Sequence, residues 1–549
     1  MTQATEAPRT KGVLAWVERT GNKLPDPVFI FFYLIAALIV ISLFAWLLGW
    51  SAVHPTERDE ATGAATIIAA ESLLSPENIR RLWVEMPATF THFHPLGYVL
   101  VVMLGAGVAE RSGLFGSAMK AGVRNAPKFL LTPIVALVAM MGNLAADAAY
   151  VVLIPLAGVI YAAAGRHPIA GIAAAFAGVS GGFSANLLPG QLDALLFGIT
   201  EAAAEAIVPG WDANIAGNWY FIMAMTVVFL PVIWYVTDRM VEPRLGRYVP
   251  EGAAAVAAGG APVAAREPDD KDTEAEADAD ASLAPQQRRG LKYAGLAVLA
   301  VVALWLFFTL GPGTPLIDEE AAPEGRLTPF YQSLVAGFFV LFLAAGWAYG
   351  KGAGTIGDHR DLVRMMSQSM ADLAYYLVLA FAAAHFVAMF NWSNLGLISA
   401  VHGAHGLEQL ALPTPLLLGM IVLFAAVLNL FVGSASAKWA LLAPVLVPML
   451  MLLGISPETT TAAYRVGDSA TNIITPRRVN VPLILHFCQR WQKDFGLGSL
   501  AAMMLPYSMW LLAVGTALIM AWVALDVPLG PDAPVYYTLP APTAPPPAP

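Results

Sequence analysis

Residues 465–478 read RVGDSATNIITPRR, a polar and breakable stretch in a chain that is otherwise strongly apolar. Arg465 and Asp468 stand three residues apart, small hydroxyl and amide side chains follow, and Pro476 comes near the end. Irregular backbone at membrane depth is tolerated only where it is buried in protein or lines a water-filled cavity. The stretch therefore predicts an interrupted membrane helix beside a binding site.

The composition supports a membrane setting. The chain has 549 residues, of which 58% are hydrophobic and 13% charged, whereas soluble proteins carry about 25% charged residues. Runs near the length of about 20 residues that crosses a bilayer occur at 28–50, 291–310, 329–349, 413–432 and 500–525. The first run lacks a cleavage site and is interpreted as a membrane helix rather than a signal peptide. We expect an all-α polytopic membrane protein.

Charge and cysteine content exclude several other classes. Cys488 is the single cysteine, so there is no intrachain disulfide framework. The formal net charge of −9 arises mostly from residues 267–280, which hold eight acidic residues and one lysine. The rest of the chain is nearly neutral, and nothing indicates binding to nucleic acid.

Basic residues set the expected orientation, since cytoplasmic loops are enriched in Lys and Arg. Arg9, Lys11, Arg19 and Lys23 precede the first apolar run and place the N-terminus in the cytoplasm. The later alternation fits about nine crossings. The expected organisation begins with a cytoplasmic N-terminal segment (1–26) and a first membrane half (27–242). A disordered acidic cytoplasmic linker (243–290), a second membrane half (291–527) and a Pro-rich tail that ends outside (528–549) follow.

The two halves resemble each other. NLAADAAYVVLIPLAG (143–158) and GSASAKWALLAPVLVP (433–448) both run from small residues through an aromatic into an apolar stretch with proline. Further on, GGFSANLLPG (181–190) mirrors GDSATNIITP (467–476). Interrupted apolar segments at matching places in two repeats point to the binding site of a secondary transporter.

Both Ser-Ala stretches supply candidate binding groups. Gly182 and Gly467 can open the helices, and the freed backbone could act with the hydroxyl and amide side chains of Ser184, Asn186, Ser469 and Asn472. The alternative is packing between helices through small polar residues, which is common in membranes.

Charged residues within apolar runs are the second group of candidates. Carboxylates inside a membrane are costly and usually functional, so Asp147 and Asp468 are candidates for ion or proton coupling. Arg465 could instead pair locally with Asp468 at i, i+3 spacing. Asp193 is a weaker candidate that could sit near an interface.

Lys438 and Trp439 place a cation beside a flat aromatic ring, which suits an anionic aromatic substrate. The alternative is an interfacial anchor at the end of a helix. His92 and His94 have the spacing of a metal pair, but they lack a partner cluster and are interpreted as interfacial. The sequence contains no signature of an enzyme and no ATP-binding loop, which favours coupling to an ion gradient.

Together these motifs strongly resemble the p-aminobenzoyl-glutamate transporter family (AbgT) of the ion transporter superfamily, over roughly 15–245 and 290–527. The resemblance implies a homodimer in the bacterial inner membrane. It also implies nine membrane helices and two re-entrant hairpins per protomer, in an inverted repeat. The family's functional positions fall on Asp147, Ser436, Trp439, Pro457, Arg465, Asp468 and Pro476.

The resemblance also implies a substrate. p-Aminobenzoyl-glutamate has two carboxylates and an aromatic ring. Arg465, Lys438 and opened N–H groups could receive the carboxylates, and Trp439 could stack on the ring. Asp147 and Asp468 would carry protons or bind Na⁺, with a possible Na⁺ near Asn186, Asp468 and Asn472, and no other cofactor is expected. Rival interpretations are proton-driven efflux of sulfonamides, a passive channel and an intramembrane enzyme.

Overall fold

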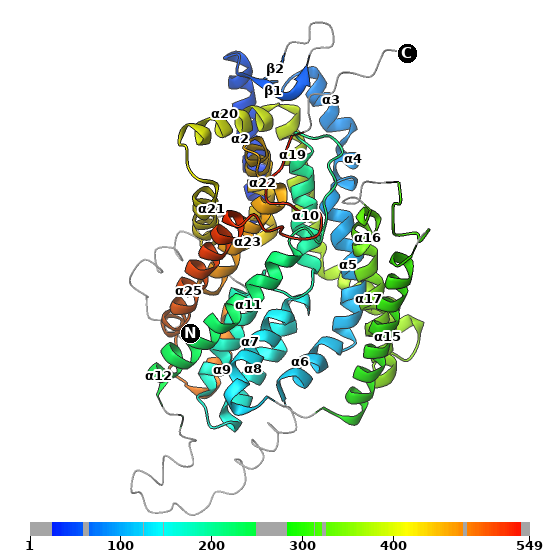
Figure 1. The fold of residues 1–549 in the computed structure, drawn as a ribbon, viewed down its shortest axis with the longest axis vertical. Coiled ribbons are helices and arrows are strands. Elements are labelled where there is room, and N and C mark those ends of the chain that lie inside the picture. Colours follow the sequence, from blue (N-terminus) through cyan, green and yellow to red (C-terminus); the bar gives the residue numbers. More distant parts are fainter. Residues whose placement is uncertain are drawn as a thin grey trace, which may run out of the picture.

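The computed structural model describes residues 25–58, 65–124, 126–145, 148–246, 248, 283–311, 313–320, 326–475 and 480–539 (Figure 1). Two predicted functional residues, Asp147 and Pro476, lie outside the described residues. Nearly all of the predicted segment 1–26 and most of the predicted linker 243–290 lie outside them as well.

Long apolar helices dominate the fold, as predicted. Within the described ranges, seven helices are long and apolar enough to cross a bilayer: α2 (Pro27–Leu47), Trp219–Leu245, α15 (Pro285–Thr309), α17 (Leu334–Ala353), α19 (Ala374–Trp392), α22 (Ala435–Leu452) and α25 (Leu497–Ala524). Trp219–Leu245 consists of α11 (Trp219–Tyr235), the π-helix η4 (Val236–Val241) and α12 (Glu242–Leu245). An eighth candidate is the pair α5 (His94–Arg111) and α6 (Leu114–Arg124), bent by 62°. The number of nine membrane crossings stays a prediction.

Shorter helices carry the interruptions. The first half has η1 (Lys128–Leu130), α7 (Leu131–Met141), η2 (Gly142–Ala145), α8 (Ala148–Ala163), α9 (Pro168–Phe176), the π-helix η3 (Ala177–Gly181) and α10 (Gln191–Ala204). The second half has α21 (Thr414–Asn429), α23 (Pro457–Thr471), η5 (Asn472–Ile474) and α24 (Val481–Trp491). Each half therefore contains a pair of consecutive helices, α7 with α8 and α21 with α22. Each pair is followed by a helical segment that ends at a break.

The remaining elements lie between the membrane helices. They are α3 (Pro76–Val84), α4 (Met86–Thr91), α16 (Thr328–Gln332), α18 (His359–Asp372) and α20 (Leu395–Gln409). Two strands, β1 (Ser51–Arg58) and β2 (Ala65–Ala69), form an antiparallel sheet that pairs Ser51 with Ala69. The expectation of an all-α membrane protein did not include this small sheet.

The buried side chains form two large clusters. One joins α7, α8, α9, α11, α21, α23 and α25, and the other joins α2, α10, α19, α20 and α22. Helices α5, α15 and α17 pack against one another at the right of Figure 1. Only 6% of the apolar window of α15 is buried, which suits a helix that faces lipid.

Part of the predicted tail is packed structure. Leu529, Ala533 and Val535 are buried. The Ser456 N–H donates to the Val535 carbonyl at 3.1 Å, and Ile455 forms a β-bridge with Tyr536. Residues 529–537 therefore cover the beginning of α23. At the other boundary, α15 begins at Pro285, inside the range predicted as linker.

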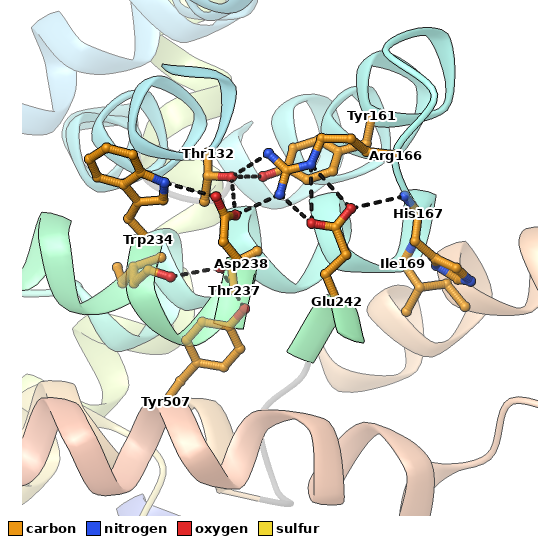
Figure 2. A network of polar contacts seen from close by, with 11 residues as sticks. Thr132, Tyr161, Arg166, His167, Ile169, Trp234, Thr237, Asp238, Glu242 and Tyr507 are labelled. Atoms are coloured by element: carbon orange, nitrogen blue, oxygen red, sulfur yellow. Dashed lines mark hydrogen bonds and ion pairs between the residues drawn. The ribbon is translucent and has the colours of Figure 1, made fainter. Parts of the chain in front are cut away.

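A polar network around Arg166 joins helices of the first half (Figure 2). The Arg166 Nε lies 3.1 Å from both carboxylate oxygens of Glu242, and its Nη2 lies 2.6 Å from Asp238 Oδ1. Its Nη1 donates to Thr132 Oγ1 at 2.8 Å, and the guanidinium lies 4.6 Å from the ring centre of Tyr161. One cation thus connects α7, α8, η4 and α12.

The network continues into α25. The Thr237 and Tyr507 hydroxyls lie 2.7 Å apart, and Trp234 Nε1 donates to Asp238 Oδ2 at 2.8 Å. Burial lowers the pKa of His167, with Glu242 acting in the opposite direction. Arg166 is therefore the permanent positive charge between the two carboxylates.

We expect Arg166→Met to destabilise the protein, because it leaves two carboxylates without their shared cation. The cost should be about 2 kcal/mol, less than for a fully buried pair, because both carboxylates keep some exposure. Thermal unfolding in detergent measures it. Arg81→Met, which breaks an exposed pair with Glu77, is the control and should change stability by less than about 1 kcal/mol. Equal losses in the two variants would contradict a structural role for the network.

Helices α21 and α23 cross closely at Gly467. A Cβ atom at this position would lie 2.3 Å from the Val422 carbonyl oxygen and 2.9 Å from Ala425 Cβ. The helix continues through Gly467 to Thr471, so the break lies after this glycine. Gly467 thus permits a close helix crossing, and it does not itself open the helix.

Gly467→Ala should force α21 and α23 apart and lower the unfolding free energy by about 1–3 kcal/mol. Gly406→Ala in α20, where a Cβ meets nothing within 4 Å, should be neutral or stabilising by up to about 1 kcal/mol. Thermal unfolding of both variants tests the crossing. A stability loss in Gly406→Ala as large as in Gly467→Ala would refute it.

Candidate functional site

The two helix breaks meet inside the protein. In the first half the helix ends at Gly181, and non-helical chain continues to Gly190, where α10 is capped. In the second half α23 gives way to η5 after Thr471. The Ser184 N–H donates to Ser469 Oγ at 2.9 Å, and both residues are buried. The predicted resemblance between these stretches thus corresponds to direct contact.

In each half, the side chain of one asparagine joins the helix pair to the break that follows it. Asn429 Nδ2 donates to the Asp468 carbonyl at 2.6 Å and to Asn472 Oδ1 at 2.9 Å. Asn143 Nδ2 donates to the Met140 carbonyl at 3.0 Å and the Gly182 carbonyl at 3.3 Å. These amides replace water for backbone groups that the breaks leave unpaired.

Sequence reasoning missed both asparagines. A signal was present, because Asn-Leu stands at 143–144 and again at 429–430, ahead of Tyr150 and Trp439 in the two motifs. Thr471 Oγ1 accepts from Asn429 Nδ2 at 2.9 Å, which extends the second cluster.

Lys438 and Asp468 form a buried ion pair at the second cluster. Their side chains are each 2% exposed, and Lys438 Nζ contacts both Asp468 Oδ1 and Asn429 Oδ1. An isolated charge at this depth would be very costly, so each ion requires the other. Lys438 is therefore not an interfacial anchor.

Arg465 forms a second buried ion pair, and Asp193 is its partner. Arg465 Nη1 lies 2.6 Å from Asp193 Oδ1, with side-chain exposures of 1% and 5%. Asp193 Oδ2 also accepts from the Gly190 N–H at 2.7 Å, which fixes the carboxylate at the start of α10. The local pair between Arg465 and Asp468 does not form, because each residue has a distant partner. Asp193 is thus central to the structure rather than interfacial.

A cavity of about 290 Å³, here called the central cavity, opens beside this second pair. Asn186 and Arg465 line it, and each keeps a buried side-chain atom, Asn186 Oδ1 and Arg465 Nε, without a hydrogen-bond partner. Such atoms are rare in folded proteins and mark places where a ligand or water can bind. Three aromatic residues also line it: Tyr150, Phe183 and Tyr376.

Trp439 lies away from this cavity. It is fully buried, and its ring stacks on Tyr464 with centroids 4.5 Å apart. Its Nε1 donates to Thr200 Oγ1 at 2.9 Å, and Thr200 Oγ1 lies 2.9 Å from Thr461 Oγ1. In this structure Trp439 therefore joins α10, α22 and α23, and stacking on a substrate would require rearrangement.

The other predicted residues have different surroundings. Pro457 is the first residue of α23, a position that suits proline because its missing N–H would have no helical partner. Ser436 is partly exposed, with its Oγ 3.2 Å from Ser434 Oγ. A Cβ at Gly182 would lie 2.6 Å from both the Gly178 carbonyl oxygen and Met140 Cγ, so this position requires glycine.

The predicted ligands for Na⁺ are only partly brought together. Asn429 connects Asp468 and Asn472, whereas Asn186 lines the central cavity. Across the part of the chain that the structure describes, no group of three or more His, Cys, Asp or Glu residues could hold a metal ion. Any Na⁺ site here would depend on amide, hydroxyl and carbonyl oxygens, with one carboxylate.

Comparisons with known proteins agree on one family. Residues 12–537 match the AbgT putative transporter family. The chain is 35% identical over 517 residues to the p-aminobenzoyl-glutamate transport protein of Escherichia coli (strain K12), covering 94% of this chain and 95% of the relative.

Two solved structures share the fold. The YdaH transporter of Alcanivorax borkumensis, which has an unusual topology, is 40% identical with a TM-score of 0.81 and covers 92% of this chain and 100% of its own. MtrF of Neisseria gonorrhoeae, from a class of antimetabolite efflux pumps, is 39% identical with a TM-score of 0.84, with coverages of 93% and 97%.

A double-mutant cycle should show that Lys438 and Asp468 depend on each other. Lys438→Met leaves a buried carboxylate alone and should cost about 3–5 kcal/mol of stability, whereas adding Asp468→Asn should recover much of that loss. Chemical unfolding in detergent gives the four values. The matched control is the exposed pair of Arg364 with Asp361, whose coupling should stay below about 1 kcal/mol. Additive losses at Lys438 and Asp468 would argue against the pair.

Proposed function

The chain belongs to the AbgT putative transporter family, and from this premise we propose that it is an ion-gradient-driven secondary transporter of p-aminobenzoyl-glutamate. The observation that carries the proposal is the arrangement around the two breaks. Two buried ion pairs flank helix ends whose backbone groups are held by asparagine side chains. Such sites, built from interrupted helices of two repeats, are where secondary transporters bind substrates and ions.

The central cavity suits one part of this substrate well. Arg465 is its positive charge, and its unpartnered Nε can donate to a substrate carboxylate while Nη1 remains on Asp193. Tyr150, Phe183 and Tyr376 offer apolar faces for the aryl ring. They replace Trp439 as the proposed ring-binding residues, because Trp439 has no exposed surface.

Asp468 is the proposed coupling carboxylate. It is the anion of the buried pair with Lys438, and its backbone carbonyl is bound by Asn429. Protonation or Na⁺ binding at this position would change the charge balance against Lys438 and so the packing of the break against α21 and α22. Asp147 is proposed as its counterpart in the first half, from the sequence motif alone.

The proposed membrane arrangement follows the sequence. The N-terminus lies in the cytoplasm of a bacterial cell, and the protein lies in the inner membrane. The α7–α8 and α21–α22 pairs are proposed re-entrant hairpins of an inverted repeat, and two protomers form a homodimer. Transport needs no ATP and leaves the substrate chemically unchanged.

One alternative has a specific observation in its favour. MtrF, which shares this fold at 39% identity, comes from a class of antimetabolite efflux pumps. Sulfonamides resemble the p-aminobenzoyl part of the substrate, so the same aromatic cavity could bind them. Proton-driven efflux of sulfonamides is therefore the second candidate function.

We expect reconstituted proteoliposomes to accumulate labelled p-aminobenzoyl-glutamate against its gradient when the gradient of the coupling ion, which is Na⁺ or H⁺, is imposed. Asp468→Asn should abolish this accumulation, because the coupling charge is lost, and the exposed Glu408→Gln should leave it intact. For each coupled ion, a tenfold ion gradient supports up to about tenfold accumulation of substrate. Varying the two gradients independently identifies the ion.

Four results would contradict the proposal or part of it. Flux without accumulation would indicate a channel, and a chemically altered substrate would indicate an enzyme. Gradient-driven transport of sulfonamides with no transport of p-aminobenzoyl-glutamate would favour the efflux function. Retained accumulation in a normally folded Asp468→Asn variant would remove Asp468 from the coupling step.

A further inference from the structure

A second cavity, of about 330 Å³, lies under the C-terminal segment and is here called the tail cavity. Residues from four separate parts of the chain line it: 211–214, 328–332, 456–458 and 532–537. One of these parts belongs to the tail, which the charge pattern places outside. Another adjoins the loop GPGTPLIDEEAAPEG (311–325), which is acidic, has no Lys or Arg and is therefore also expected outside. The tail cavity therefore belongs to the side of the protein opposite the cytoplasmic N-terminus.

Glu458 lines this cavity from the first turn of α23. The residue is only 6% exposed, and the described part of the chain provides its carboxylate with no ion-pair partner. The carboxylate has hydrogen bonds from the Ser456 hydroxyl and from its own backbone N–H, but both of these groups are neutral. Two further contacts act on the backbone and not on the carboxylate. Ser456 caps the helix by accepting from the Thr459 N–H at 3.1 Å, and Asn218 Nδ2 donates to the backbone carbonyl of Glu458 at 2.9 Å.

A buried acceptor beside Glu458 is also unsatisfied. Asn218 is fully buried, and its Oδ1 has no hydrogen-bond donor, although its Nδ2 holds the Glu458 carbonyl. Among the residues that the structure describes, no cation pairs with the buried Glu458 carboxylate. Burial without a cation favours a carboxylic acid over a carboxylate.

The other titratable groups around the cavity are acidic or phenolic. Those lining it with Glu458 are Asp212, Tyr331, Asp532 and Tyr537. Helix α10, beside α23, carries Glu201, and Glu205 is the residue at its C-cap. A multivalent metal is a poor occupant, since no three acidic residues among those described are close enough to share one. Nearby negative charge without a cluster of chelating residues favours the binding of a single proton at Glu458.

Glu458 is aligned with the ion pairs of the functional site. Glu458, Thr461, Arg465 and Asp468 follow one another along α23 at spacings of three, four and three residues, which places them along one side of the helix. With a rise of about 1.5 Å per residue, Glu458 lies about 10 Å along the axis from Arg465. A charge change at one end of this rigid, buried helix can therefore act on the pairs further along it.

We propose that Glu458 is a proton-binding site of the transport cycle, filled from the aqueous phase through the tail cavity. The proton adds to the carboxylate to give the neutral acid and leaves again as the cycle proceeds, so no further reactant is required. This inference rests on the proposed function. It assigns the outer step of coupling to a residue separate from Asp468.

The direct test is the infrared spectrum of the full-length protein in detergent. We expect a protonated-carboxyl band at neutral pH that disappears when the pH is raised, is absent from Glu458→Gln and is retained in Asp212→Asn. Asp212 is a suitable control because it lines the same cavity but is exposed. A spectrum unchanged by Glu458→Gln would overturn the inference, whatever the transport activity.

The second test uses proteoliposomes with an imposed pH gradient and clamped membrane potential. Each coupled proton supports about tenfold accumulation per pH unit, and Glu458→Gln should lose this accumulation while still exchanging labelled for unlabelled substrate. Glu458→Asp should restore part of it, and Asp212→Asn should match the wild type. A first-turn glutamate also stabilises its helix, but loss of that role alone would lower thermal stability and leave proton-driven accumulation in place.

The outcomes separate this inference from the proposed function. Proton-driven accumulation that survives in Glu458→Gln overturns the inference and leaves the transporter function intact. A wild-type protein that neither exchanges nor accumulates the substrate overturns the proposed function, and the infrared band still decides whether Glu458 binds a proton.

Discussion

The buried ion pair between Lys438 and Asp468 is the interaction on which the centre of the molecule depends. Both side chains are 2% exposed, so neither ion can exchange its partner for water without a large cost. The pair also fixes backbone, because Asn429 contacts Lys438 and binds the carbonyl of Asp468. The α21–α22 pair and the end of α23 are thereby held as one unit.

The two halves share a plan but not a charge pattern. Each has an asparagine that donates to backbone at a break, and the breaks meet through Ser184 and Ser469. The second half supplies Lys438, Arg465 and Asp468. Among the described residues of the first half, Asp193 forms the ion pair with Arg465. The Arg465–Asp193 pair thus ties the halves together across 272 residues of sequence.

Polar groups away from the centre follow the same physical rule. In an apolar setting a buried charge or backbone group must find its partner within the protein. Arg166 does so with Asp238 and Glu242, and residues 529–537 do so by bonding to the start of α23 (Figure 2 shows the Arg166 network). Glu458 departs from the rule, since among the described residues its buried carboxylate has no cationic partner. That departure is the physical ground for a site whose charge changes during function.

The sequence alone determined the class of the fold and where its interruptions fall. Hydrophobic runs of bilayer length predict membrane helices because only helices and closed barrels satisfy the backbone in lipid. The repeated Ser-Ala motifs also located the two breaks, which follow Gly181 in the first half and Thr471 in the second. Local composition carries this information because helix length and helix breaking are local properties.

Only the tertiary structure decided which charges meet. Spacing allowed Arg465 to pair with Asp468, yet Arg465 pairs with Asp193 and Asp468 with Lys438. The tertiary structure also shows that Trp439, proposed as a substrate contact, packs between α10, α22 and α23. It shows as well that Asn143 and Asn429 belong to the site. These outcomes depend on contacts between segments far apart in the chain, and the pairing energy of a buried charge depends on the whole surrounding fold rather than on sequence neighbours.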